Sequence, residues 1–504
     1  MANNVNITYA KSGLGQPAVG EDFISGFIYY TPTATYPSGF SSSANTQEIL
    51  SMVQAASLGI IPGVGETLAS GSTTCSSAGT VGSTIVVNAT STVLGTITLA
   101  TYVTVIGDTT STIPANIAAL INNGTPSTGF VANSSTTSLI ITGPTQANGI
   151  TISITITGTV TFSNVSFALI GYVKSPIDPL YYHLAQCFNA NPTADVFVMI
   201  QTGTSSTSQY SEIQTLQNFA GGKIRQFAVY EQIAFVTGNV ALLQTQANAI
   251  SANNMPAEIF YQADFSSVTN LTSLADLTLL NGQNVSVMFG QDGGNLAVNG
   301  GARLYAVQGK SIGMVGAFLG TVSSTLVSTS VAWVGSFNLD QGVELDTLSL
   351  ANGTLTATQS PNLLNAIDSK GYNFLVKYVG VGGSYFNNDY TCINATSDYN
   401  CVTNNRTIHK VARQTRAAEL ANLAAPIYFN TDGTISSNSI AFYASVCKGV
   451  LTIMQSAGEI SQFAVVINPK QNVVSTKNLA ISVMVVPTGT ANQINITLGF
   501  VVSI

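Results

Sequence analysis

The last eleven residues of the chain alternate strictly, and this pattern restricts them to one kind of structure. Apolar side chains occupy every second position, namely Ile494, Ile496, Leu498, Phe500, Val502 and Ile504. Because side chains of a β-strand point alternately to opposite faces, the pattern predicts a strand with one apolar face. Such a face is buried only when another sheet edge lies beside it.

The first residues of the chain repeat this pattern on a smaller scale. Val5, Ile7 and Tyr9 alternate with Asn6 and Thr8. Two apolar strands at the ends predict arms that join the sheets of neighbouring copies, where main-chain hydrogen bonds supply affinity and alternate side chains supply specificity. We therefore expect a subunit that is linked to its neighbours by strand exchange.

Charged residues are rare and make up 7% of the chain, against about 25% in an ordinary soluble domain. A monomer that stays dissolved at high concentration needs a charged surface, whereas a chain that spends its life inside an assembly does not. The deficit therefore favours a self-assembling protein. A secreted adhesin or surface-layer protein is rich in the same residues and remains the alternative at this point.

The distribution of charge and hydrophobicity excludes other classes of protein. The chain has 15 Lys and Arg residues and a formal net charge of −7, so it lacks the basic stripe of a nucleic-acid binder. No stretch reaches the roughly 18 consecutive apolar residues of a membrane span, and the start lacks the features of a secretion signal. We expect assembly in the cytoplasm, without nucleic acid and without membrane insertion.

An insert interrupts the first part of the chain. A strand at residues 22–30 and a helix at residues 45–58 precede it. From residue 62 to residue 170 charge almost disappears, and short strand patterns alternate with Ser/Thr/Gly turns and one helix at residues 114–122. This spacing predicts a small β-rich domain with its own core, placed in an exposed loop of a larger domain.

Beyond the insert, apolar strands alternate with amphipathic helices. The expected strands are 196–200, 224–229, 258–261 and 285–289, and the expected helices are 181–188, 211–219, 239–251, 271–277 and one around 312–322. This alternation indicates an α/β layer with a sheet covered on both faces. After residue 339 the pattern becomes α+β, with strands 345–350, 374–381, 479–486 and 494–504 and helices 407–423 and 436–456.

The predicted fold class is therefore a multidomain α/β and α+β chain with an inserted small β-rich domain and extended N- and C-terminal strand arms. The expected parts are an N-terminal arm (1–20), an α/β domain (21–61 plus 171–340), the insert (62–170), an α+β domain (341–486) and a C-terminal strand arm (487–504).

Several motifs of the chain resemble those of contractile phage tail sheath proteins. Those of the C-terminal half are Asn387-Asn388-Asp389-Tyr390-Thr391-Cys392, Ser397-Asp398-Tyr399, Asn404-Asn405-Arg406-Thr407-Ile408-His409-Lys410, Asp432-Gly433-Thr434-Ile435 and Val486-Pro487. Upstream, Tyr181-Tyr182-His183-Leu184 with Asn191-Pro192 is similar to the first βα unit of these proteins. The insert, with Gly107-Asp108-Thr109, is similar to an extra domain of some long-tailed phage sheaths. The resemblance runs over nearly the whole chain and is strongest from residue 371 onward.

This resemblance implies a structural subunit of a contractile tail sheath. Such subunits form hexameric rings that stack helically around a tail tube and shorten to drive the tube through a bacterial envelope. The implied partners are other copies of the chain, the tail tube protein, and baseplate and tail terminator proteins. The implied location is the tail of a virion that is assembled in the host cytoplasm. His409 departs from the family, which tends to carry an acidic residue at that position.

The sequence offers little to an enzyme, and we expect no catalytic residue, cofactor or metal. His183 and His409 are the two histidines, and neither lies beside an evident nucleophile motif, so both are assigned structural roles. The Gly-rich stretches at 290–294 and 380–383 match neither a P-loop nor a dinucleotide fingerprint. Three acidic residues lie near one another, Asp340, Glu344 and Asp346. Their spacing is not that of a calcium-binding loop.

Two further expectations concern the second half of the chain. Lys410, Arg413 and Arg416 lie along one side of a predicted helix. They form either an exposed, internally paired face or a seat against an acidic tube or adjacent ring. Trp333, the one tryptophan, lies in an apolar stretch and is expected in the core.

Overall fold

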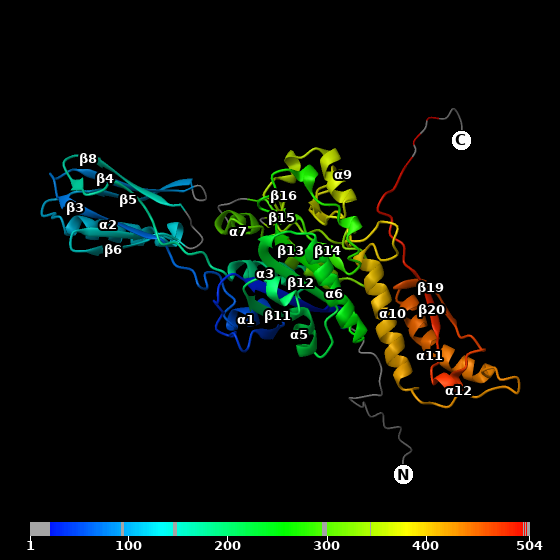
Figure 1. The fold of residues 1–504 in the computed structure, drawn as a ribbon. Coiled ribbons are helices and arrows are strands. Elements are labelled where there is room, and N and C mark those ends of the chain that lie inside the picture. Colours follow the sequence, from blue (N-terminus) through cyan, green and yellow to red (C-terminus); the bar gives the residue numbers. More distant parts are fainter. Residues whose placement is uncertain are drawn as a thin grey trace, which may run out of the picture.

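The structure is a computed structural model that describes residues 21–496, 498 and 500, except residues 92–94, 145–148, 295–299 and 343. Its parts lie in a row: the insert at one end, a central α/β body, and a unit of helices with a small sheet at the other end (Figure 1). The predicted fold class, α/β and α+β with an inserted β-rich part, is confirmed.

The central body is built on a six-stranded sheet with the strand order β14-β13-β12-β1-β11-β2. The strands are β1 (Ile24–Thr31), β2 (Thr46–Ile49), β11 (Asp195–Thr202), β12 (Gln226–Ala234), β13 (Glu258–Asp264) and β14 (Val285–Val287). All neighbouring pairs are parallel except β11 with β2, which forms an antiparallel edge. Every residue of β1 is buried, as expected for a strand covered on both faces.

Helices cover both faces of this sheet, as predicted. Helices α3 (Asp178–Ala190) and α8 (Val315–Ser324) lie on one face, where Phe27 of β1 shares a buried cluster with Leu184 and Phe318. Helices α5 (Glu212–Phe219) and α6 (Gly238–Ala252) lie on the other face, where Ile28 shares a second cluster with Leu216 and Leu243. The short helices α1 (Met52–Ser57) and α4 (Ser205–Ser208) follow the strands β2 and β11 in the chain.

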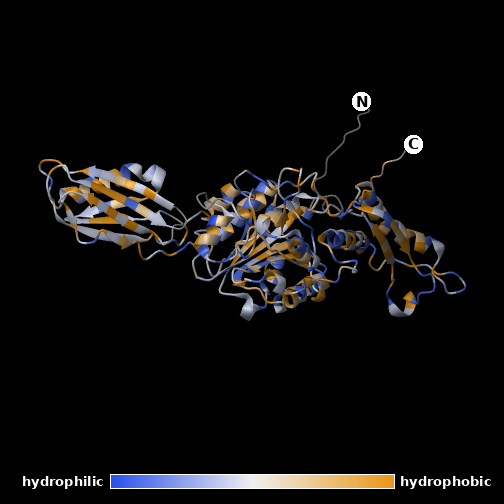
Figure 2. Ribbon diagram, turned by 90° about the horizontal axis from the view of Figure 1, so that it is seen from above, coloured by the Kyte–Doolittle hydropathy of each residue, from blue (hydrophilic) through white to orange (hydrophobic). Residues whose placement is uncertain are grey.

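The insert has its own hydrophobic core, separate from that of the central body. Its elements are β3 (Ser70–Ser77), β4 (Thr84–Ser91), β5 (Gly95–Val103), α2 (Thr112–Thr128), β6 (Val131–Ser135), β7 (Ser138–Thr142), β8 (Thr151–Thr157), β9 (Thr161–Phe162) and β10 (Ser166–Ala168). They form two four-stranded sheets, and Figure 2 shows the apolar residues along their strands. The chain enters and leaves side by side, through the bridges Thr67–Val173 and Ser70–Ile170.

The chain between residues 290 and 392 packs into the central body rather than into a separate domain. Besides α8, its elements are β15 (Gly290–Asp292), α7 (Gly301–Gln308), β16 (Leu348–Leu350), η4 (Thr356–Thr358), α9 (Pro361–Ser369), β17 (Leu375–Val376) and β18 (Tyr385–Phe386). Leu350 and Phe374 belong to the cluster on one face of the central sheet, and Leu348 and Phe386 to the cluster on the other. We therefore propose the domain boundary near residue 401 instead of residue 340.

The C-terminal unit follows this boundary. Its elements are α10 (Val402–Leu420), α11 (Ser437–Ser456), β19 (Ile460–Val466), α12 (Val473–Thr476) and β20 (Ser482–Pro487). Strands β19 and β20 pair antiparallel and pack on α10 and α11 through a small cluster that includes Val411 and Leu451. The long predicted helices thus exist, but β19 was not predicted.

Two predicted helices of the central body are wrong. The segment expected as a helix at residues 45–58 is divided, because Thr46–Ile49 pairs with the open edge of β11 and α1 begins only after Ser51. The Ser51 hydroxyl accepts a hydrogen bond from the Gln54 amide at 3.2 Å and so caps that helix. The segment at residues 271–277 forms two short 3-10 turns, η2 (Leu271–Ser273) and η3 (Leu277–Leu279).

The expectation that Trp333 lies in the core is also wrong. Its side chain is 58% exposed and contacts Phe337 edge-to-face, with the ring centroids 6.5 Å apart. The surrounding residues form turns instead of a helix or strand, so the apolar stretch has no single face to bury.

Candidate assembly interface

The predicted arm residues are exposed wherever the structure describes them. Ile494, Ile496, Leu498 and Phe500 are 77%, 77%, 90% and 109% exposed, and none of them lies in a strand. The strand predicted for residues 494–504 is therefore absent from the described part of this segment in a single subunit. The described residues after β20 lead away from the two-stranded sheet in Figure 1. The remaining predicted arm residues, Val5, Ile7, Tyr9, Val502 and Ile504, lie outside the described residues.

The two-stranded sheet of β19 and β20 has one covered face and one exposed face. Phe463, Val465, Val483 and Val485 pack against the cluster on α10 and α11. On the opposite face, the apolar side chains of Val466, Met484 and Val486 are 52%, 54% and 50% exposed. Among the described residues, no further strand pairs with either outer edge. A sheet of two strands is marginally stable alone, and open edges accept additional strands.

The first turn of α10 is anchored in the central body by buried polar groups. The Asp389 carboxylate accepts hydrogen bonds from the Thr403 amide at 3.0 Å and from the Thr403 hydroxyl at 2.5 Å. The buried Arg406 guanidinium donates to the Thr325 hydroxyl at 2.9 Å and to the Thr325 carbonyl at 3.3 Å. Buried donors and acceptors without partners are costly, so these contacts fix where the C-terminal unit begins.

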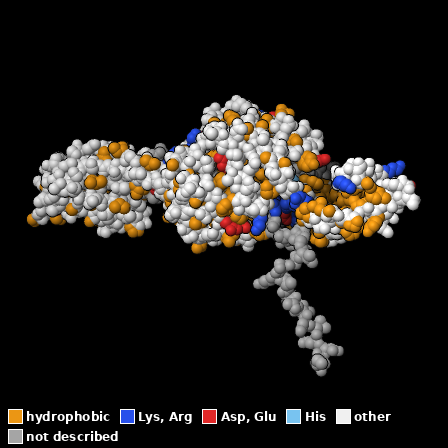
Figure 3. Space-filling view, turned by 60° about the horizontal axis from the view of Figure 1, so that its bottom comes forward, with side chains coloured by type: hydrophobic (Ala, Val, Ile, Leu, Met, Phe, Trp, Pro, Cys, Tyr) orange, Lys and Arg blue, Asp and Glu red, His pale blue; other side chains and the backbone are white. Residues whose placement is uncertain are grey.

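The basic residues of α10 divide into two kinds. Lys410 Nζ lies 2.7 Å from Asp22 Oδ2 and 2.5 Å from Glu459 Oε1, and Arg413 Nη2 lies 2.7 Å from Asp22 Oδ1. Arg416 is exposed. Figure 3 shows Lys and Arg side chains gathered on this underside, between the central body and the C-terminal unit. A seat against a tube or an adjacent ring thus stays a proposal, for which Arg416 is the most accessible of the three side chains.

His409 joins α10 to the central sheet through a buried hydrogen-bond network. Its Nδ1 lies 3.3 Å from Oε1 of Glu258. The Asn284 amide nitrogen lies 3.3 Å from His409 Nε2 and 2.9 Å from Glu258 Oε1. Asn405 contacts the other carboxyl oxygen of Glu258 at 3.3 Å. Asn284 can donate to Nε2 when that nitrogen carries no proton, and the roles at Nδ1 depend on which of His409 and Glu258 holds the proton between them.

Burial controls the protonation of this pair. It raises the pKa of Glu258 to about 8, with partial compensation from Asn284, Asn405 and Arg406. Burial, and secondarily the charge of Arg413, lowers the pKa of His409 to about 3. The 3.3 Å separation alone would suit an ion pair, but both shifts oppose charge, so we interpret the pair as neutral near pH 7. His409 therefore has a structural role, as expected.

The other side chains weighed as functional candidates in the sequence do not converge on one site in the described part of the chain. His183, which belongs to α3, is buried beside the rings of Phe27 and Tyr230, and burial lowers its pKa to about 3. Asp346 pairs with Lys377 at 2.8 Å, Asp340 accepts from the Gly342 amide at 2.8 Å, and Glu344 lies near the Gly301 amide at 3.4 Å. Among the described residues, no group of three His, Cys, Asp or Glu side chains is placed to hold a metal ion.

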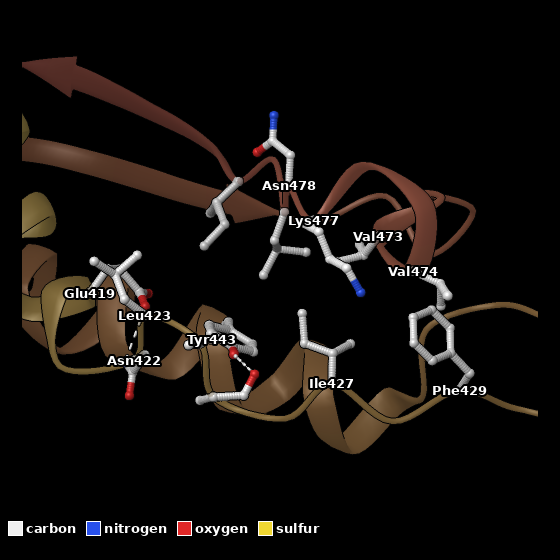
Figure 4. A pocket seen from close by; sticks show the side chains of 14 residues that line it. Glu419, Asn422, Leu423, Ile427, Phe429, Tyr443, Val473, Val474, Lys477 and Asn478 are labelled. Atoms are coloured by element: carbon white, nitrogen blue, oxygen red, sulfur yellow. Dashed lines mark hydrogen bonds between the residues drawn. The ribbon is translucent and has the colours of Figure 1, made fainter.

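A cavity of about 730 Å³ lies at the far end of the C-terminal unit, between α10, α11 and α12. Its lining is mostly apolar and includes Leu423, Ile427 and Phe429 (Figure 4). The charged side chains among its described lining residues are Glu419 and Lys477.

Among the described residues, no helix combines the length and apolar character needed to cross a membrane.

Comparison with known proteins gives one family and several related folds. The family model described as DUF2586, C-terminal domain, matches residues 398–504. No curated protein matches the chain. The sheath tail protein from Desulfitobacterium hafniense is 9% identical, with 96% of this chain and 100% of that chain covered and a TM-score of 0.41.

Two assemblies contain similar chains. A chain of the anti-feeding prophage baseplate in the contracted state is 12% identical over 99% of this chain and 97% of its own, with a TM-score of 0.45. A chain of the contracted PVC sheath complex, an extracellular contractile injection system, is 12% identical over 64% of this chain and 81% of its own, with a TM-score of 0.42. The solved structures to which this chain is similar thus come from a tail sheath protein and from contractile injection assemblies.

Proposed function

We propose that this chain is the structural subunit of a contractile tail sheath, without catalysis or cofactor. It polymerises as stacked hexameric rings around a tail tube and contracts to drive the tube through a bacterial envelope. One observation carries the proposal. The two-stranded sheet of β19 and β20, whose outer edges pair with no other described strand, lies in the same subunit as a C-terminal segment whose described alternate apolar side chains are exposed.

Strand exchange accounts for both the open edges of the sheet and the exposed apolar side chains of the C-terminal segment. The C-terminal arm of one subunit adds to the β19–β20 sheet of a neighbour, and the N-terminal arm of another subunit adds to the same sheet. Burying six apolar side chains at about 1.5–3 kcal/mol each gives roughly 9–18 kcal/mol gross per C-terminal arm, before the cost of ordering is subtracted. Such a link is strong enough to survive while the bodies of the subunits turn against each other.

The scarcity of charge supports the proposed contraction. Contraction requires the central bodies to exchange one set of neighbours for another. A surface of hydroxyl and amide groups makes this exchange without leaving buried charges unpaired. The partners are other copies of the chain, the tail tube protein, and baseplate and terminator proteins. The insert, at the opposite end from the arms' acceptor sheet (Figure 1), projects from the sheath.

The proposal is tested by removing residues 493–504 from the full chain. We expect soluble, folded subunits that no longer form sheaths, because the body of the subunit keeps its own cores while the linking strand is lost. Negative-stain microscopy of the purified protein gives the measurement, since striated hollow cylinders distinguish a sheath from flat arrays of a surface-layer protein.

A matched pair of variants isolates the apolar face of the arm. Ile494→Ser with Ile496→Ser removes two exposed apolar side chains and should prevent assembly. Asn495→Ser, between them, changes a residue that the alternation places on the other face and should leave assembly intact. Normal cylinders from the truncated chain would refute strand exchange, and flat arrays from the parent chain would refute the sheath.

A further inference from the structure

Asp22 lies where the proposed N-terminal arm meets the folded body. It belongs to η1 (Glu21–Phe23), a short 3-10 turn that directly precedes β1, the middle strand of the central sheet. Residues 1–20, the proposed arm, come immediately before it. The contacts of Asp22 therefore decide how the root of the arm is held.

The side chain of Asp22 is shared between two cations of the C-terminal unit. Its Oδ1 lies 2.7 Å from Arg413 Nη2 and its Oδ2 lies 2.7 Å from Lys410 Nζ. Lys410 also reaches Oε1 of Glu459 at 2.5 Å. Glu459 directly precedes β19. One chain of charges thus runs from the arm root through α10 to the start of the two-stranded sheet.

These charges are largely removed from water. The side chains of Asp22, Lys410, Arg413 and Glu459 are 21%, 15%, 16% and 4% exposed. Burial by itself would raise the pKa of Asp22, but Lys410 and Arg413 outweigh burial and hold that pKa below its usual value. Asp22 therefore stays ionised at neutral pH, and a charge-assisted contact of this kind is stronger than one on an open surface.

The C-terminal unit does not need Asp22 to stay attached. Arg406 binds the Thr325 carbonyl, Asn405 donates to the Gln283 carbonyl, and Ser328 donates to the Gly458 carbonyl. These contacts join α10 and the turn before β19 to the central body without involving the Asp22 side chain. The main-chain carbonyl of Asp22, by contrast, accepts hydrogen bonds from Gln226 Nε2 at 3.1 Å and from Arg406 Nη2 at 3.5 Å.

We propose that Asp22 is a positioning residue that fixes the root of the N-terminal arm to α10 and, through Lys410 and Glu459, to the subunit's own acceptor sheet. The direction in which a subunit offers its N-terminal arm is then set by the position of the sheet that receives arms from its neighbours. A pull on the arm passes to that sheet through the charge cluster. That residues 1–20 act as an arm rests on the proposed function. The ionic contacts of Asp22, by contrast, belong to the single subunit.

The test compares Asp22→Asn with the parent in the full-length chain. The substitution keeps the shape of the side chain and removes its charge. Hydrogen exchange of the free subunit should become faster at residues 21–24, by about tenfold or more, because the side-chain amide loses the negative charge and one of the two acceptor oxygens, and stay unchanged at residues 402–413. Arg413→Gln removes one of the two contacts and should give a smaller effect at residues 21–24.

Asp346→Asn is the matched control. It removes an ion pair of similar length, 2.8 Å to Lys377, from an exposed site and should leave exchange at residues 21–24 unaltered. Unchanged exchange at these residues in Asp22→Asn would overturn the inference. Equal acceleration at residues 402–413 would also overturn it, because Asp22 would then hold the helix and not the arm root.

Microscopy of the same proteins separates this inference from the proposed function. If the parent forms sheaths and Asp22→Asn forms fewer or shorter ones while its exchange is altered only at residues 21–24, both proposals are supported. If the parent forms no sheaths but the exchange pattern is as expected, the link stands and the sheath function fails.

Discussion

Replacing Glu258 with Gln should change how the stability of this protein depends on pH. Glu258 is fully buried at the start of β13, beneath α10, and contacts His409 and Asn284. Gln has nearly the same shape and cannot ionise. The comparison therefore isolates the proton that Glu258 carries in the folded state.

The sign of the effect follows from the direction of the pKa shift. The pKa of Glu258 is raised from 4.5 to about 8 by burial, so the folded state keeps a proton that the unfolded chain releases. The contribution to stability is complete below pH 4.5 and is lost as pH rises through the folded pKa. At 1.36 kcal/mol per pKa unit, this shift corresponds to at most roughly 5 kcal/mol in the free energy of unfolding.

Urea unfolding at pH 5, 7 and 9, followed by circular dichroism, measures this effect. The difference in unfolding free energy between Glu258→Gln and the parent should move in favour of the variant as pH rises, by several kcal/mol between pH 5 and 9. The contribution of His409 has the opposite sign, because its pKa is lowered to about 3. It is present above pH 6.5 and lost as pH falls, and because His409 contacts Glu258 its share is measured separately with a His409 variant.

His409→Gln is the complementary variant and should flatten the acid side of the profile. A difference between Glu258→Gln and the parent that stays constant from pH 5 to 9 would refute the assignment of a protonated, buried Glu258.

The remaining predictions concern packing and assembly. Gly316→Ala should destabilise the subunit by about 3 kcal/mol, because a Cβ there would lie 2.1 Å from the His183 carbonyl oxygen where α8 meets α3. Gly449→Ala in α11 should stabilise the subunit by about 0.5–1 kcal/mol, because no atom lies within 4 Å of the new Cβ. Equal changes in the free energy of urea unfolding for the two variants would contradict this packing. Met484→Thr with Val486→Thr, on the exposed face of β20, should leave the urea midpoint of monomer unfolding unchanged and reduce sheath formation seen by microscopy. Val485→Thr, on the covered face, should lower the urea midpoint of monomer unfolding.

The sequence was most informative where side-chain periodicity alone decides the structure. The continuous apolar runs of β1, β11 and β12 indicated strands buried on both faces, and all three lie inside the central sheet. The long helices α10 and α11 were expected from the same kind of pattern. The separate core of the insert followed from the sudden loss of charge and the spacing of short strands.

Periodicity failed where pairing with a distant segment decides the outcome. The residues of β2 have a helical pattern, but an open edge of β11, about 150 residues further along, draws them into the sheet. Trp333 lies in an apolar stretch that forms turns, and its side chain is exposed because the turns present no single apolar face to a core.

The amino-acid sequence by itself determined which side chains alternate at the two ends of the chain, and the strands expected there remain predictions. The tertiary structure alone decided the partners of the charged residues of α10. Asp22 and Arg413 are 391 positions apart, and no local pattern relates them. Their contact exists because the central sheet places the start of β1 beside α10, and a charge that loses water there is stable only with an opposite charge within reach.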